Sequence, residues 1–415
     1  MAAEDVLDAS RGLLQRRPGL AALVLLGGLL ALDFLLKLAG VELAVGSVKL
    51  LGGRLPISRL LTLVWDGLVI GLAIGLAGIG LSMTYSILSF ANFAHGDYVT
   101  SGAFAGWAVT FLLAGLASGQ GDPGFLLSVG SGQGPSATEL GINVISTPLA
   151  IVAGLVVAIL ATVGLTLLVD RLVYRPMRDA GAISLLIASI GVALALRYAI
   201  VFVFTGTNRG LTAGGGRLRL VGRGGRLVFE GVFNPPDAPR QVLFAWGLPG
   251  RFGDYTAEVL SVTSNELTLV VTALVLMAGL HLLLQRTKLG TSMRAMADNE
   301  DLALVTGIPT ERVIRATWVI GGGLTGAAGY LIALERGTLS FNLGWVLLLL
   351  IFAAVILGGI GSVYGAMAGG VVIGLTNTVS LVWIPSSFAT AAAFAIMILM
   401  LLFKPDGLFG GVTTA

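Results

Sequence analysis

Long apolar runs alternate with short polar stretches along almost the whole chain. A helix that crosses the hydrocarbon core of a bilayer needs about 20 consecutive apolar residues. Runs that approach or exceed this length cover residues 19–36, 62–86, 98–117, 147–170, 181–204, 264–284, 315–334, 346–358, 365–384 and 387–403. The run at 346–358 is short for a span, and a polar patch interrupts the chain after 62–86. We therefore predict an all-α polytopic membrane protein, a bundle of 8–10 transmembrane helices with broken helices.

A dense, mixed-charge segment at 291–315 separates two of these runs. In a chain that is 56% hydrophobic and 11% charged, such a segment belongs in water. Its residues 290–297 favour a helix, Asp298 or Asn299 can cap a second helix, and Gly307 suits a left-handed helix end. The pattern predicts short amphipathic helices at one face of the bundle, on which a partner outside the membrane acts. The alternative is a solvated loop between spans.

A second polar segment, 205–262, carries a strand pattern instead. Residues 217–230 alternate apolar and polar positions around Gly224 and Gly225, which predicts a β-hairpin, and a turn follows at 234–237. We expect a small external β-hairpin insertion that serves as a docking surface or as a flexible insertion. The stretch 118–146 is a Gly/Ser-rich external loop without recognisable chemistry.

Glycine makes up 60 of the 415 residues and recurs at helical spacing. Small residues at every fourth position let helix backbones approach closely in lipid. The stripes are Gly67, Gly71 and Gly75; Gly102 and Gly106; and Gly361, Gly365 and Gly369. They predict tight helix–helix seams, and whether these seams also slide during transport stays open.

A weak internal match suggests a candidate internal repeat. Residues 102–109 read GAFAGWAV and residues 365–372 read GAMAGGVV, and each stretch follows a polar, helix-breaking patch. Transporters often contain duplicated halves whose broken helices lie at corresponding places near the substrate path.

The positions of the arginine and lysine residues predict which loops of the bundle face the cytoplasm. Short cytoplasmic loops carry an excess of these residues. With a cytoplasmic N-terminus and ten spans, the basic loops 171–180 and 285–315 are cytoplasmic, and 205–262 is external. Lys49, Arg54 and Arg59 oppose this assignment, since they fall on an outside loop.

Composition excludes several kinds of chemistry. The mean hydropathy is +0.94, cysteine is absent and only two histidines occur, so disulfides, iron–sulfur clusters and multi-histidine metal centres are ruled out. A net charge of +3 does not indicate nucleic-acid binding, and no P-loop motif occurs. We expect no cofactor, no metal site and no catalytic residue. If transport is driven by ATP, a partner subunit hydrolyses it.

Few polar side chains lie within the apolar runs. Asn92, His95 and Asp97 either stabilise a broken helix along a translocation path or form a turn at the cytoplasmic edge. Arg197 either pairs with a carboxylate, including that of a substrate, or extends to the outer membrane face, which its place past the middle of its run favours.

Three ordered motifs, at 80–106, 294–331 and 353–375, resemble the permease subunits of branched-chain amino acid ABC importers. The NFAHG sequence at 92–96 is similar to the H-type subunit. The resemblance covers 62–405 except the outer loops. The chain departs from the family pattern in two places, an extra N-terminal span and the enlarged 205–262 segment.

The resemblance implies a permease domain at 61–405, preceded by an extension with one span at 1–60 and followed by a tail at 406–415. It also implies a prokaryotic inner-membrane location and partners: a second permease subunit, homologous or identical, two cytoplasmic ATPases, and an external solute-binding protein. Coupling to the ATPases falls on Arg294, Ala295, Asp298, Ala303, Gly307 and Ile308. The translocation path falls on Asn92, Phe93, Ala94, His95, Gly96, Gly358, Gly359, Gly361 and Ser362.

Rival functions remain open from the sequence. Related permeases carry urea, short amides or sugars, so the resemblance does not identify the solute. An ion- or proton-coupled transporter that works alone would need a relay of buried ionisable residues, and only Asp66, Asp97 and Arg197 are candidates. A passive channel would conduct without energy input.

Overall fold

The computed structural model describes residues 18–45, 48–119, 124, 126, 135–213, 215–223, 226–234, 241–247 and 258–409. Residues 235–237 of the predicted turn and residues 120–123, 125 and 127–134 of the 118–146 loop lie outside these residues. The chain forms two compact units, Met1–Thr62 and Leu63–Ala415, which are described separately.

The first unit contains helix α2 (Pro18–Ala39) and a hairpin of strands β1 (Glu42–Val45) and β2 (Val48–Gly52). The Asp33 carboxylate joins helix and hairpin, because it pairs with Lys37 Nζ at 2.7 Å and accepts a hydrogen bond from the Gly52 amide at 2.6 Å. Apolar side chains along α2, including Leu25, Leu26 and Leu35, point outward. That exposure suits a helix surrounded by lipid.

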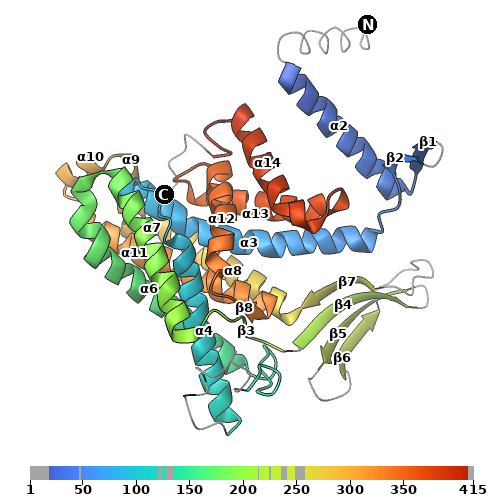
Figure 1. Cartoon of the computed structure of the whole chain (residues 1–415), viewed down its shortest axis with the longest axis horizontal. Helices are drawn as coiled ribbons and strands as arrows, with labels where there is room; N and C mark the ends of the chain where they lie inside the picture. Colours follow the sequence, from blue (N-terminus) through green and yellow to red (C-terminus); the bar gives the residue numbers. More distant parts are fainter. Residues whose placement is uncertain are drawn as a thin grey trace. The chain divides into compact units, whose positions relative to one another are not determined.

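Helices dominate the second unit (Figure 1). Eight helical stretches in the described part of the chain are long and apolar enough to cross a membrane, which confirms the predicted multi-pass helical protein. Their helices are α3 (Ile57–Leu88), α4 (His95–Ala117), α6 (Pro148–Val169), α7 (Ala182–Phe204), α8 (Ser264–Arg286), α11 (Thr310–Arg336), α13 (Val363–Val379) and α14 (Ala389–Phe403). Helix α12 (Leu343–Gly358) has only 16 residues, about 24 Å, and is too short to span.

Helix α11 forms the centre of this unit and packs against α4 and α6 through small residues. A side chain at Gly102 of α4 would come within 2.6 Å of the Gly326 Cα of α11, and one at Gly106 would overlap the Tyr330 ring. Polar bonds add to these contacts, since Thr110 Oγ1 lies 2.7 Å from the Tyr330 hydroxyl. The predicted seam at Gly102 and Gly106 is confirmed.

A second seam joins α3 and α13, which run antiparallel. A Cβ atom on Gly67, Gly71 or Gly75 would lie within 3.4 Å of α13 backbone atoms. The sequence stripe on α13 needs correction, however. Gly370 and Gly374 face α3, Gly365 and Gly369 face α12, and Gly361 lies before the helix begins.

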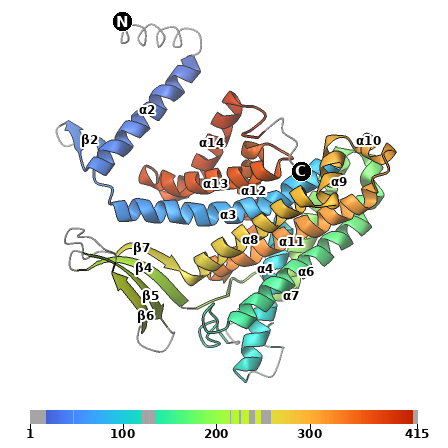
Figure 2. The same cartoon turned by 180° about the vertical axis from the view of Figure 1, so that it is seen from behind.

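Four strands form a sheet in the order β6–β5–β4–β7. Strands β4 (Gly215–Arg223) and β5 (Arg226–Asn234) are the predicted hairpin, with Arg223 opposite Arg226 at its turn. The sequence analysis missed β6 (Gln241–Gly247) and β7 (Glu258–Thr263), which extend it on both sides. Strand β7 continues directly into α8, whose other end leads to α9 (Lys288–Asp298), so the sheet and α9 lie at opposite ends of α8 (Figure 2).

The α3–α13 seam predicts that one added methyl group destabilises the protein at a glycine inside the seam and not at a glycine outside it. A Cβ on Gly374 would lie 2.3 Å from the Gly67 carbonyl oxygen and 2.4 Å from the Gly71 Cα, so Gly374→Ala should separate the helices and destabilise the protein by about 1–3 kcal/mol. Gly164→Ala is the matched control, because nothing lies within 4 Å of its Cβ position on α6. Thermal unfolding in detergent measures both. Equal melting temperatures for the two variants would contradict this assignment of the seam.

Candidate functional site

The polar segment between α8 and α11 folds into two short helices, α9 and α10 (Glu300–Val305). Thr287 caps α9 by accepting a hydrogen bond from the Gly290 amide at 3.1 Å, and Asn299 caps α10 by accepting one from the Leu302 amide at 2.8 Å. Gly307 ends α10 with a φ of +84°, a left-handed conformation that favours glycine. The predicted helices, cap and stop are all present.

The two faces of α10 differ sharply in burial. Ala303 is buried within the chain, whereas Leu302, Leu304 and Val305 are 61%, 60% and 84% exposed. Among the other residues assigned to coupling, Asp298 and Gly307 are exposed, while Arg294, Ala295 and Ile308 are half-buried. The apolar part of the segment's exposed surface is therefore the triad Leu302, Leu304 and Val305, which exposed polar residues such as Asp298, Asp301 and Thr306 surround in the sequence. Ala303 supports it from beneath.

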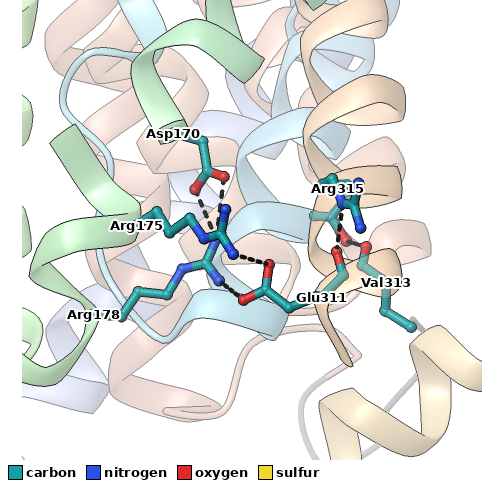
Figure 3. Close-up of polar contacts among 7 residues, drawn as sticks. Asp170, Arg175, Arg178, Glu311, Val313 and Arg315 are labelled. Carbon is teal, nitrogen blue, oxygen red and sulfur yellow. Dashed lines mark hydrogen bonds and ion pairs between the residues drawn. The ribbon is translucent and has the colours of Figure 1, made fainter. Parts of the chain in front are cut away.

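An ion-pair cluster holds the start of α11 against the segment that continues α6 (Figure 3). That segment comprises a π-helical turn, η1 (Asp170–Tyr174), and a 3₁₀ turn, η2 (Arg175–Ala180). Arg178 donates to Glu311 Oε1 at 2.6 Å and to both Asp170 oxygens at 3.0 and 3.1 Å, and Arg175 lies 3.9 Å from Glu311 Oε2. The two basic loops thus lie at the same end of the bundle.

The first helix break, Asn92–Gly96, separates α3 from α4, and two of its backbone amides and the Asn92 side-chain carbonyl oxygen form hydrogen bonds within the bundle. The Asn92 Oδ1 atom accepts hydrogen bonds from the Ala94 amide at 3.1 Å and the Tyr174 hydroxyl at 3.2 Å. The Phe93 amide donates to Ser189 Oγ of α7 at 3.0 Å. Asn92 and His95 are buried.

This break lies deep in the bundle and not at its edge. His95 Nε2 is 2.9 Å from the Ala77 carbonyl oxygen, eleven residues before the end of α3, which corresponds to about 16 Å along that helix. Gly96 packs on Gly344 at the start of α12, where an added Cβ would lie 2.7 Å from the Gly344 oxygen. Of the two interpretations from the sequence, the broken helix holds, and the edge turn is wrong.

Arg197 pairs with Asp97 of α4, so the expectation that it extends to the outer face is wrong. The guanidinium donates through Nε and Nη2 to the two Asp97 oxygens at 3.1 and 2.9 Å. Asp97 is fully buried, and the Arg197 Cζ atom lies 4.5 Å from the centre of the Trp345 ring. Burial of a carboxylate requires such a partner, which outweighs access to the membrane surface.

The second break, Gly358–Ser362, joins α12 to α13. Gly359 and Gly361 adopt φ values of +105° and +87°, and Ser362 caps α13 by accepting a hydrogen bond from the Gly365 amide at 3.0 Å. The Gly358 carbonyl, freed by the end of α12, accepts a hydrogen bond from the Phe409 amide at 2.9 Å. The chain's last described residues thus complete this break.

The structure brings the second break, but not the first, beside the α9–α10 segment. Met293 of α9 lines a narrow crevice together with Ser86 of α3 and Val363 of α13. The first break lies along the other half of α12, with Gly96 against Gly344 and the Phe93 ring centre 5.2 Å from that of Phe352. Helix α12 therefore connects the two breaks, and sequence reasoning missed this connection because α12 was counted as a short span.

Comparison with known proteins assigns the chain to a family. Residues 63–403 match the family model of the branched-chain amino acid transport system permease component. The chain belongs to this permease family. Its helix breaks, its α9–α10 segment and the α3–α13 seam all lie within the matched residues.

Two of the curated relatives match the permease over most of their length, and a third matches it over less than half. The high-affinity branched-chain amino acid transport system permease protein BraD of Pseudomonas aeruginosa is 26% identical over 347 residues, which is 83% of this chain and 94% of the relative. LivH of Escherichia coli K12 is 27% identical over 349 residues, 84% of this chain and 94% of the relative. A probable LivH of Methanocaldococcus jannaschii is 34% identical over 144 residues, 33% and 45% of the two chains. No solved structure gave a significant match.

The buried pair makes a prediction about unfolding. Arg197→Gln leaves the Asp97 carboxylate buried without its partner and should cost about 3–5 kcal/mol. The double variant Asp97→Asn/Arg197→Gln removes both charges and should recover much of this loss. Thermal unfolding of the wild type, the single variants and the double variant measures the coupling. A double variant that loses the sum of both single losses would contradict the pairing.

The ion-pair cluster predicts a local effect of Glu311→Gln. Without the carboxylate, Arg175 and Arg178 lose their link to α11, so backbone amides in 170–180 should exchange with solvent deuterium faster. Asp301→Asn is the control, since it neutralises another carboxylate in the first turn of a helix, α10. Hydrogen–deuterium exchange with mass spectrometry compares the two. Unchanged exchange in Glu311→Gln would show that the cluster does not hold this segment.

Proposed function

We propose that this permease is the membrane subunit of an ATP-driven importer for branched-chain or similar neutral amino acids. Solute crosses by alternating access, and the chain hydrolyses no ATP itself. The observation that carries this proposal is the exposed apolar triad of α10, which is held on a helix capped by Asn299. An apolar surface in water is typical of a protein interface. The relatives' names supply the solute class.

The proposal assigns partners to opposite ends of the bundle. Two cytoplasmic ATPases bind at the α9–α10 end, where the basic residues Arg171, Arg175 and Arg315 also gather. An external solute-binding protein meets the other end, which carries the sheet. A second permease subunit, homologous or identical, completes the path in the inner membrane of a prokaryotic cell. The extension at 1–60 lies outside this core function, whereas the start of the tail at 406–415 supports the second break through the hydrogen bond from the Phe409 amide to the Gly358 carbonyl.

The two breaks give a route from the ATPases to the path. Met293 of α9 lines a crevice with Val363, the residue after the second break, and α12 extends from that break to Gly96 of the first one. A helix of 16 residues moves as a rigid rod, so a displacement at Gly358–Ser362 reaches Asn92–Gly96. We assign both breaks to the translocation path on this basis.

The rival of a self-sufficient, proton-coupled transporter finds little support. Such a transporter needs buried ionisable groups that exchange protons along a chain. Asp97 is held by two hydrogen bonds from Arg197, and His95 Nε2 faces a backbone carbonyl. These contacts are those of structural groups. A permease for urea or short amides remains the alternative within the same fold.

The exposed triad gives the test of this function. The double variant Leu302→Asp/Val305→Asp places two charges on the proposed ATPase-binding surface, which should abolish ATP-driven leucine uptake and reduce copurification of the ATPases by at least about tenfold. The control is Val45→Asp, which changes an exposed valine in the β1 strand. Uptake into proteoliposomes and quantitative copurification measure the effects. Normal uptake with normal ATPase association would remove the triad from the coupling interface.

A further inference from the structure

A polar cavity lies at the end of α8 opposite the α9–α10 segment, where the sheet joins the bundle. Its volume is about 230 Å³. Its charged and polar walls come from β4, the start of α8 and the end of α11, and include Arg217, Ser264, Asn265, Glu266 and Glu335. A cavity of about 150 Å³ is large enough to hold benzene, so this one accommodates the head group of an amino acid.

The cavity offers hydrogen-bond acceptors that nothing else in the described chain uses. Asn265 is only 9% exposed, and its Oδ1 atom has no hydrogen-bond partner among the described residues, although its amide nitrogen donates to the Leu334 oxygen at 3.0 Å. The buried Ser264 Oγ atom likewise lacks a partner there. A buried acceptor without a donor costs free energy, which a ligand with N–H groups would recover.

Charges of both signs border this polar cavity. Glu266 is oriented by Trp65, whose Nε1 donates to Oε2 at 2.7 Å, and by the Thr263 amide at 3.2 Å. Glu335 lines the same cavity, and Arg217 supplies a guanidinium. None of Glu266, Glu335 and Arg217 forms an ion pair within 4 Å in the part of the chain that the structure describes. The wall thus pairs carboxylates and neutral acceptors with one cationic donor.

An apolar crevice adjoins the cavity through Glu335, which lines both. Its other walls include Val69 and Ile70 of α3, Leu269 of α8, and Ile332 of α11. The crevice encloses only about 10 Å³, room for about one water molecule. An aliphatic side chain would enter it only when these helices separate.

We propose that this cavity binds the head group of a neutral aliphatic α-amino acid at the outer mouth of the permease, which rests on the proposed function. The ammonium group donates to Glu266, Glu335 and Asn265 Oδ1, and the carboxylate accepts from Arg217. The aliphatic side chain faces the crevice. Strand β4 belongs to the 205–262 insertion, so the insertion contributes directly to solute capture.

Gly215 keeps the cavity open. Its φ of +148° disfavours any other residue, and an added Cβ would lie 3.2 Å from Ser264 Oγ. A side chain at this position would therefore crowd the unpartnered Ser264 hydroxyl in the wall of the cavity.

Equilibrium binding of radiolabelled L-leucine to the full chain in lipid nanodiscs, without ATPases or solute-binding protein, tests this site. We expect saturable binding that unlabelled leucine displaces. Neither 4-methylpentanoate, which lacks the ammonium group, nor leucinamide, which lacks the carboxylate, should displace it effectively. Because this comparison uses the unaltered chain, it does not depend on the folding of any variant. Absence of saturable binding, or equal displacement by 4-methylpentanoate, would overturn the proposal.

Variants then locate the site. Glu335→Gln and Arg217→Gln should each weaken leucine binding by at least about tenfold, whereas Glu42→Gln and Arg59→Gln, which change residues of the first unit, should not. Sodium or calcium binding that depends on Glu335 while leucine binding does not would mark an ion site and contradict the proposal.

Uptake by the assembled importer separates the two proposals. A raised half-saturating leucine concentration in Glu335→Gln and Arg217→Gln supports the cavity as a capture site. Wild-type uptake kinetics in both variants would overturn the cavity alone, whereas absence of neutral amino acid uptake by the wild-type assembly would overturn the proposed function itself.

Discussion

Helices in lipid gain little by burying one apolar side chain against another, so close approach of their backbones must hold the bundle together. In this permease, that approach depends on glycine. Gly374 lies against Gly67 and Gly71, Gly326 against Gly102, and Gly344 against Gly96. Each contact places backbone atoms where a single methyl group would collide. Replacing these glycines would displace the helices that carry both breaks.

Close backbone contact also explains how irregular structure survives inside the membrane. A broken helix exposes amides and carbonyls that lipid cannot satisfy. Here Ser189 and Asn92 bond the amides of the first break, and Ser362 caps the helix after the second. Because α12 extends between the two breaks, we propose that it couples them mechanically. In this proposal, a push on α9–α10 moves the second break, and α12 carries the displacement to the first.

Local patterns in the sequence predicted much of this fold. Apolar run length located the spans, the Asn299 cap and Gly307 stop defined α10, and the alternation around Gly224 and Gly225 predicted the β4–β5 hairpin. The less predictable features depend on contacts between distant segments. Arg197 and Asp97 are 100 residues apart, and Arg178 and Glu311 are 133 apart. No local sequence pattern indicates that the arginine of each pair neutralises the charge of its distant carboxylate.

Two further features escaped the sequence for physical reasons. Strand β7 is short and continues into a transmembrane helix, so its six residues merge with the apolar run that follows. Helix α12 is almost entirely apolar, so its sequence resembles that of a transmembrane helix that is too short to cross the bilayer. Its role as the link between the breaks becomes apparent only when Gly344 is seen against Gly96. The family resemblance assigned Ala303 to the coupling surface, yet its side chain is buried and its larger neighbours on α10 are exposed.

The most direct test of this account is the distance between the two breaks during the ATPase cycle. Because the chain has no cysteine, spin labels can be attached at two exposed positions. Tyr198→Cys lies next to Arg197, which pairs with Asp97 beside the first break, and Ile360→Cys lies in the second break. Double electron–electron resonance on the reconstituted importer then compares the nucleotide-free and ATP-bound states. The account predicts that the distance distribution shifts when ATP binds. An unchanged distribution in an importer that still takes up leucine would contradict it.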